Sequence, residues 1–209
     1  AALLRATLMD TEHFSKTGPG APSDLWTPVL GPAVLLNMEG ADHLALRRTL
    51  GPLFAPAYVE PLVAASLPTA DLTARLVAGE SVDLVAEAKR NASIMISQLV
   101  GISDAQIDDE LFRRVSSITR FVRLSRPRLS DSQVAAARGI LAELTAHARI
   151  AYAGDPSTVP GRMRALGLGE EEAMGAVGAF VLTGTETLVS YIPRLIALLS
   201  NALVWRESG

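Results

Sequence analysis

Apolar residues recur every three or four positions along most of the chain, in stretches separated by proline, glycine and serine. The clearest stretch covers residues 86–100, with Gly101 directly after it as a helix terminator. Its apolar positions are Ala88, Ala92, Met95, Ile96 and Leu99. This spacing predicts a mainly α fold. Only residues 81–85 (SVDLV) alternate in a way that favours a short β-strand.

The proline, glycine and serine residues between these stretches divide the chain into a series of predicted helices, with no repeat and no clear domain boundary. We therefore expect a single domain over residues 1–209. The segment 17–31 has four prolines or glycines in its first six positions and is predicted to be a loop. A capping box at Ser130-x-x-Gln133 predicts a helix start, and a turn is predicted at 125–129. The predicted helices cover about residues 1–14, 41–54, 55–78 (kinked at Pro68), 86–100, 104–124, 130–152, a shorter one from 155, and 170–199.

The composition excludes several classes of chemistry within these residues. The chain has 209 residues, 49% of them apolar, which supports a sizeable core, and its formal net charge of -3 gives no bias toward nucleic acid. It has no cysteine, so disulfides, thiolate nucleophiles and cysteine-bound metals are excluded here. His13 and His147 have no partner at metal-ligand spacing, and no metal site built from protein ligands is predicted. The first residues lack a signal-peptide pattern, and we expect a cytoplasmic protein.

A long apolar run from Ala173 to Leu199 is interrupted at its middle by Gly184-Thr185-Glu186-Thr187. Its length fits a membrane span, but Glu186, Pro193 and Arg194 favour a buried helix of a soluble protein, and no membrane association is predicted. Burying a carboxylate costs several kcal/mol unless something compensates it. Glu186 and Thr187 are adjacent on a helix and about 100° apart, so both could border one cavity.

The second informative segment contains His43 and Arg47, which lie four residues apart and hence on one helical face. Two such donors repel unless they share an anion, and each charge-assisted hydrogen bond to a carboxylate or phosphate contributes roughly 1.5–3 kcal/mol. The alternative is a solvated helix face on which Asp42 or Glu39 neutralises Arg47. The spacing alone leaves both interpretations open.

Taken together, the two segments resemble the cytochrome P-450 family. That family has a helix with His-x-x-x-Arg, preceded by an acidic stretch and followed by Phe-(Ser/Thr/Ala)-Pro. This chain has Glu39-Gly-Ala-Asp-His43, then Arg47, then Phe54-Ala-Pro. The family's long helix carries (Ala/Gly)-Gly-x-(Asp/Glu)-Thr, and this chain has Thr183-Gly-Thr-Glu-Thr187. The match departs from the pattern at Thr183, where a smaller residue is usual.

The resemblance implies the helical part of the P-450 fold, with little β structure, and a haem-dependent monooxygenase. His43 and Arg47 would bind the haem carboxylates, and Gly184 would let the long helix open to form an oxygen pocket. Thr187 would donate a hydrogen bond to dioxygen, and Glu186 would relay protons. The alternative for Thr187 is a hydroxyl that bonds back to a carbonyl one turn earlier. The implied partners are a hydrophobic small-molecule substrate, dioxygen, and a ferredoxin or other redox partner.

The family's Cys loop, which supplies the axial thiolate, is not found in these residues. We therefore expect an incomplete part of a longer enzyme that is inactive alone, because thiolate donation drives O–O cleavage. The resemblance also admits a haem-free P-450-like helper that binds and activates a partner enzyme. The retention of His43, Arg47, Glu186 and Thr187 favours the enzyme. The segments 17–36 and 123–129 are expected around the cavity mouth, where Trp26 contacts either substrate or core.

Overall fold

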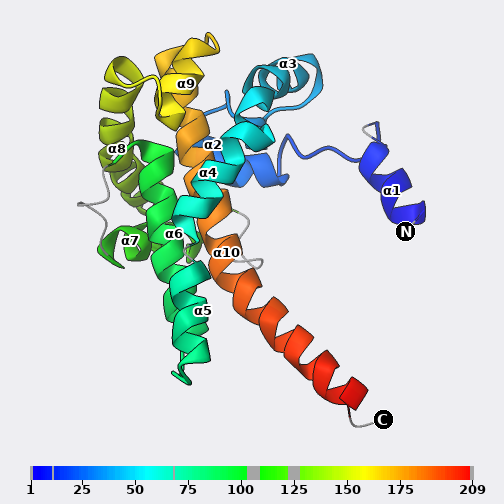
Figure 1. Cartoon of the computed structure of the whole chain (residues 1–209). Coiled ribbons are helices and arrows are strands. Elements are labelled where there is room, and N and C mark those ends of the chain that lie inside the picture. The colour runs from blue at the N-terminus through cyan, green and yellow to red at the C-terminus, as the bar shows by residue number, and fades with distance from the viewer. Residues whose placement is uncertain (1, 11, 68, 103–108, 122–127, 208–209) are drawn as a thin grey trace.

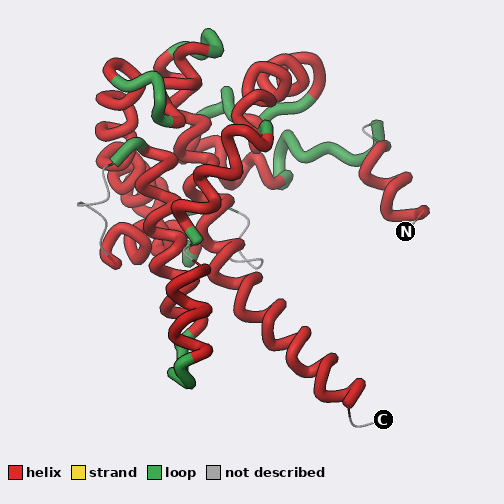
Figure 2. Tube along the Cα trace, in the orientation of Figure 1, coloured by secondary structure: helices red, strands yellow, loops and turns green. Residues whose placement is uncertain are grey.

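The computed structural model describes residues 2–10, 12–67, 69–102, 109–121 and 128–207, in which the chain forms helices joined by loops (Figure 2). No strand occurs among these residues, so the predicted mainly α fold is confirmed. The predicted strand at 81–85 is wrong. Asp83 caps α6 (Leu84–Val100) there, because its carboxylate accepts hydrogen bonds from the amides of Val85 and Ala86.

The core lies between α6 and the N-terminal half of α10 (Glu170–Glu207), the longest helix. Ala92 and Ile96 on α6 and Val177 and Val181 on α10 are all at most 1% exposed. Around this pair lie α7 (Asp109–Thr119), α8 (Asp131–Gly154) and α9 (Val159–Ala165). In Figure 1 helices α6, α7, α8 and α9 lie around the first half of α10, and its C-terminal half extends away from them.

The segment 17–31, predicted as a loop, instead contains helix α2 (Pro22–Leu30). Pro22 lies at the first position of the helix, where the missing N–H costs nothing, so proline begins the helix here. Val29 is buried, and Trp26 and Leu30 pack against the core, so tertiary contact stabilises a segment of poor helical propensity. Trp26 is thus partly buried against the core in this structure.

The remaining α-helices follow the predicted order with shifted ends, and two short 3₁₀ helices, η1 and η2, were not predicted as separate elements. They are α1 (Ala2–Met9), η1 (Leu35–Asn37), α3 (Gly40–Leu50), η2 (Gly51–Phe54), α4 (Pro56–Ser66) and α5 (Thr69–Val77). The kink predicted near Pro68 is a complete break between α4 and α5, although Pro68 itself lies outside the described residues. The capping box of α8 is confirmed: Ser130 accepts from the Gln133 amide, and the Gln133 side chain accepts from the Ser130 amide.

Two predicted boundaries differ from the structure near α9 and α10. The short helix predicted from Asp155 begins at Val159, because Thr158 caps it by accepting from the Gly161 amide. The break at 167–169 is confirmed, with Gly167 at a φ of 85°, but α10 continues to Glu207 rather than ending near 199. The turn predicted at 125–129 lies largely outside the described residues.

One described helix, over Glu170–Asn201, is long and apolar enough to span a membrane by length and composition alone. Half of its most apolar window is buried inside the structure. The core helix of a soluble protein passes the same test, so this helix does not by itself indicate a membrane.

Candidate functional site

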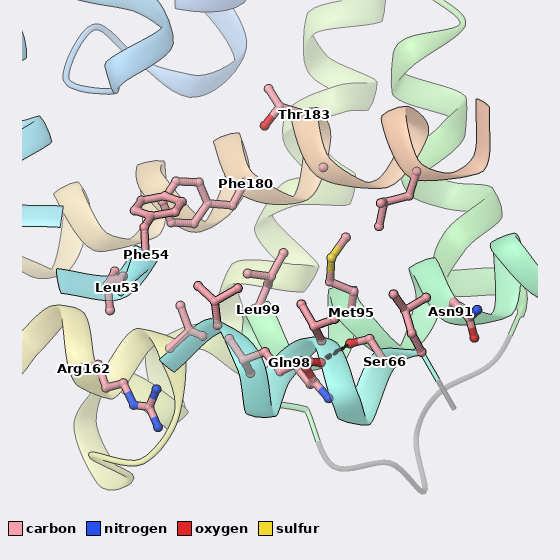
Figure 3. Close-up of a pocket in the computed structure, with 17 residues that line it drawn as sticks. Leu53, Phe54, Ser66, Asn91, Met95, Gln98, Leu99, Arg162, Phe180 and Thr183 are labelled. Carbon is pink, nitrogen blue, oxygen red and sulfur yellow. Dashed lines mark hydrogen bonds between the residues drawn. The ribbon is translucent and has the colours of Figure 1, made fainter. Parts of the chain in front are cut away.

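The two motif segments, about 130 residues apart in sequence, meet through an aromatic contact. Phe54 ends η2, and its ring packs edge-on against Phe180 of α10, with centroids 5.6 Å apart and planes at 82°. Edge-to-face pairs of this kind contribute about 0.5–1.5 kcal/mol beyond the burial of their area. Phe180 lies one helical turn before Gly184. The contact therefore holds Phe54, which follows Arg47 in sequence, beside the part of α10 that carries the Gly184–Thr187 motif (Figure 3).

A largely apolar cavity of about 350 Å³ lies between α4, α6 and α10 (Figure 3). Phe54 and Phe180 line one part of it, and Thr183 and Gly184 contribute the wall from α10. Polar groups in the wall include Ser66, whose hydroxyl donates to the Gln98 side chain at 3.1 Å. The sequence predicted a cavity beside residues 184–187, and Gly184 lines this one. The other walls were not predicted, because they come from η2, α4, α6 and α9, which no local pattern brings together.

Gly184 faces α6 across the cavity wall. A Cβ at this position would lie 3.4 Å from the Met95 methyl group, which is an ordinary contact with the end of a flexible side chain. The backbone of α10 remains α-helical through residues 184–187. The local opening of the helix expected at Gly184 is therefore not present.

The two threonines that flank Gly184 bond to their own helix. The Thr187 hydroxyl donates to the Thr183 carbonyl at 2.7 Å, and the Thr183 hydroxyl donates to the Ala179 carbonyl at 2.8 Å. The Thr187 hydroxyl thus bonds back to a carbonyl one turn earlier, which is the alternative to a hydrogen bond with dioxygen. Thr187 is exposed and does not line the cavity. Glu186 lies on α10 next to Thr187, but its side chain is outside the described part of the structure.

His43 and Arg47 lie on α3, outside the cavity wall. Arg47 is exposed and pairs with no carboxylate in the part of the chain that the structure describes, so the neutralisation by Asp42 or Glu39 considered above is not observed. Burial lowers the pKa of the His43 imidazole below its usual range; the positive charges of Lys16 and Arg47 lower it further, and Glu39 opposes them. His43 is thus held in its neutral form near pH 7.

Glu39 instead binds the segment before α2. Its carboxylate accepts from the Lys16 amide and from the hydroxyls of Ser15 and Thr17, the latter two at 2.8 and 2.9 Å. These hydrogen bonds lower the pKa of Glu39, with the Lys16 amide as the largest cause. They fix residues 15–17 on the N-terminal end of α3. Lys16 was not anticipated, and the only sequence signal was its rarity, since the chain has two lysines.

The structure thus relates the predicted residues in two groups. Gly184 lines the cavity beside α6, with Thr187 on the same helix one turn further on. His43 and Arg47 lie on α3 and form a cationic cluster with Lys16, which comes from the segment before α2. The contact between Phe54 and Phe180 connects the end of this segment of the chain to α10. No group of three or more His, Asp or Glu side chains within the described ranges could hold a metal ion.

No family model matches the chain, and no curated protein matches it. Among solved structures, the crystal structure of CalO2 is similar, with a TM-score of 0.64 and 24% sequence identity. The match covers 90% of this chain and 50% of that one, so the chain spans about half the length of CalO2. At this identity the similarity shows a shared fold.

Proposed function

We propose that this chain is part of a cytoplasmic cytochrome P-450-type monooxygenase, which inserts one atom of dioxygen into a hydrophobic small molecule. The observation that supports this best is the Phe54–Phe180 contact. It joins the His43–Arg47 segment to the turn of α10 before Gly184, so the two motifs behind the resemblance belong to one packed unit. A ferredoxin or similar redox partner would supply the two electrons.

The cationic cluster on α3 fits the carboxylates of a haem. Arg47 has no carboxylate partner among the residues described, and His43 is held neutral with both ring nitrogens able to take part in hydrogen bonds. Haem, when bound, would supply the activation of dioxygen. The chain has no cysteine, so these 209 residues would not themselves supply an axial thiolate.

Two residues of α10 would handle protons. The Thr187 hydroxyl, which now donates to the Thr183 carbonyl, would rotate to hold a water or donate a proton beside the dioxygen site. Glu186, adjacent on the helix, would move protons from solvent to Thr187. The apolar residues around Gly184 would exclude bulk water from this region.

The proposal is tested with the protein expressed from its complete reading frame. We expect it to contain a cysteine loop, to bind haem and to give the reduced carbon monoxide spectrum of a thiolate ligand. In that protein, Thr187→Ala should divert electrons from product to peroxide. Thr145→Ala is the matched control, because it removes a hydroxyl that likewise bonds back to a carbonyl one turn earlier, on α8 and outside the cavity wall.

Two results would overturn the proposal. A full-length protein with no such cysteine and no haem would leave the haem-free helper as the better explanation. Unchanged coupling in Thr187→Ala would remove the role given to Thr187.

A further inference from the structure

Lys16 is held at the N-terminal end of α3 by contacts from both its backbone and its side chain. Its amide donates to Glu39, which directly precedes α3, and its Nζ donates to the Leu35 carbonyl at 2.8 Å. An ammonium has three donors, so two remain. Burial lowers the pKa of Lys16, Glu39 opposes this change, and Arg47 adds to the lowering. The side chain is therefore partly desolvated and close enough to Arg47 for their charges to repel.

The charge in this cluster is not balanced. Glu39 is its carboxylate and already accepts three hydrogen bonds from residues 15–17. His43, Lys16 and Arg47 lie within electrostatic range of one another, and desolvation with mutual repulsion keeps His43 neutral near pH 7. Two positive charges, Lys16 and Arg47, then oppose the single charge of Glu39.

We propose that Lys16 is the second cation of a dianion site, in which it and Arg47 each bind one carboxylate of the ligand while His43 contributes a neutral hydrogen bond. This inference rests on the proposed function, in which the ligand is a haem with two carboxylates. A neutral His43 and one arginine supply a cationic partner for only one of the two carboxylates, and Lys16 supplies a cationic partner for the other. The second cation comes from the segment that Glu39 holds against α3, so Glu39 acts as a positioning residue.

The first test measures haem affinity in the full-length protein. Lys16→Met should weaken binding about tenfold, the value of one charge-assisted hydrogen bond, and Lys16→Arg should restore most of the loss. Lys89→Met is the matched control, since Lys89 is the chain's other lysine and lies exposed on α6. Iron-free protoporphyrin should show the same Lys16 dependence, and its dimethyl ester, which lacks the carboxylates, should show none.

The second test needs no cofactor and uses the 209-residue chain. Lys16→Met should raise the pKa of His43, followed by NMR, because it removes a repelling charge, whereas Lys89→Met should not. Succinate, a simple dicarboxylate, should slow acetylation of Lys16 relative to Lys89. Equal acetylation with and without succinate would overturn the dianion site.

The outcomes separate the two proposals. Haem that binds equally well to the wild type and to Lys16→Met would overturn the role of Lys16 and leave the monooxygenase standing. A full-length protein that takes up no haem, while succinate still protects Lys16, would overturn the monooxygenase and leave the dianion site standing. Thermal unfolding of Lys16→Met controls for the loss of its bond to Leu35, and a folded variant with weakened binding supports the inference.

Discussion

Gly161, in the first turn of α9, lies against the turn at Asp155 and is buried. A Cβ there would lie 1.8 Å from the Asp155 carbonyl oxygen and 2.9 Å from the Pro156 Cα, both backbone atoms. Gly161→Ala should therefore lower the free energy of unfolding by about 3 kcal/mol, measured by urea denaturation.

The matched control for this effect is Gly139, an exposed glycine within α8. A Cβ there would have no neighbour within 4 Å. Gly139→Ala should raise the unfolding free energy by about 0.4–1 kcal/mol, because alanine restricts the unfolded chain and favours the helix. Equal effects at the two sites would contradict the close approach at Asp155.

His43 makes the unfolding free energy of the chain depend on pH in mildly acidic solution. Its pKa is lowered on folding by burial and by Lys16 and Arg47, so the unfolded chain binds more protons once the pH falls through its own pKa of about 6.5. The unfolding free energy should then decrease from pH 7 to pH 5.5. His43→Asn should flatten this slope, and Lys16→Met should reduce it. An unchanged slope in His43→Asn would show that the imidazole titrates alike in both states.

At the level of elements, α2 depends on the surface of α10 beneath it. A Cβ on Gly175 would lie 2.8 Å from a methyl group of Val34, which is 1% exposed, and 3.7 Å from the Leu30 carbonyl. Gly175→Val should therefore displace α2 and expose Trp26. With Trp205→Phe as background, the Trp26 fluorescence should shift to longer wavelength. Gly139→Val introduces the same side chain on an open helix surface and should leave the emission unchanged.

The dependence of α2 on α10 also explains which elements could be predicted. The helices α6 and α8 were predicted well because local signals agree: periodic apolar residues with Gly101 after one, and a capping box before the other. The segment of α2 carries local loop signals, and burial of Val29 outweighs them. At residues 81–85 the alternating pattern was misleading, since Asp83 is a helix cap.

The candidate site was predictable to a similar extent. The spacing of His43 and Arg47 places both on α3 without any tertiary information. Lys16 joins them only because Glu39 binds residues 15–17, a contact between segments more than 20 residues apart that no periodicity encodes. The apolar run 173–199 correctly indicated a long helix, but not that its second half lies outside the core.

At the scale of the whole molecule, the C-terminal half of α10 extends away from the other helices (Figure 1). It presents an apolar stripe to solvent. Tyr191, Leu195 and Leu198 recur at helical spacing and are 60%, 37% and 67% exposed. An exposed apolar surface of this kind favours association, so the 209-residue chain should self-associate and bind a hydrophobic dye. Light scattering and dye fluorescence measure these properties.

Replacing Tyr191 and Leu198 by glutamine should reduce both signals while changing the unfolding free energy by at most about 0.5 kcal/mol, because these side chains are 60% and 67% exposed and bury little on folding. Val181→Ala, in the buried half of the same helix, should do the opposite: it should destabilise the chain by about 1–3 kcal/mol and leave association of the folded form unchanged. If the glutamine variant were as destabilised as Val181→Ala, the C-terminal half of α10 would be packed rather than exposed.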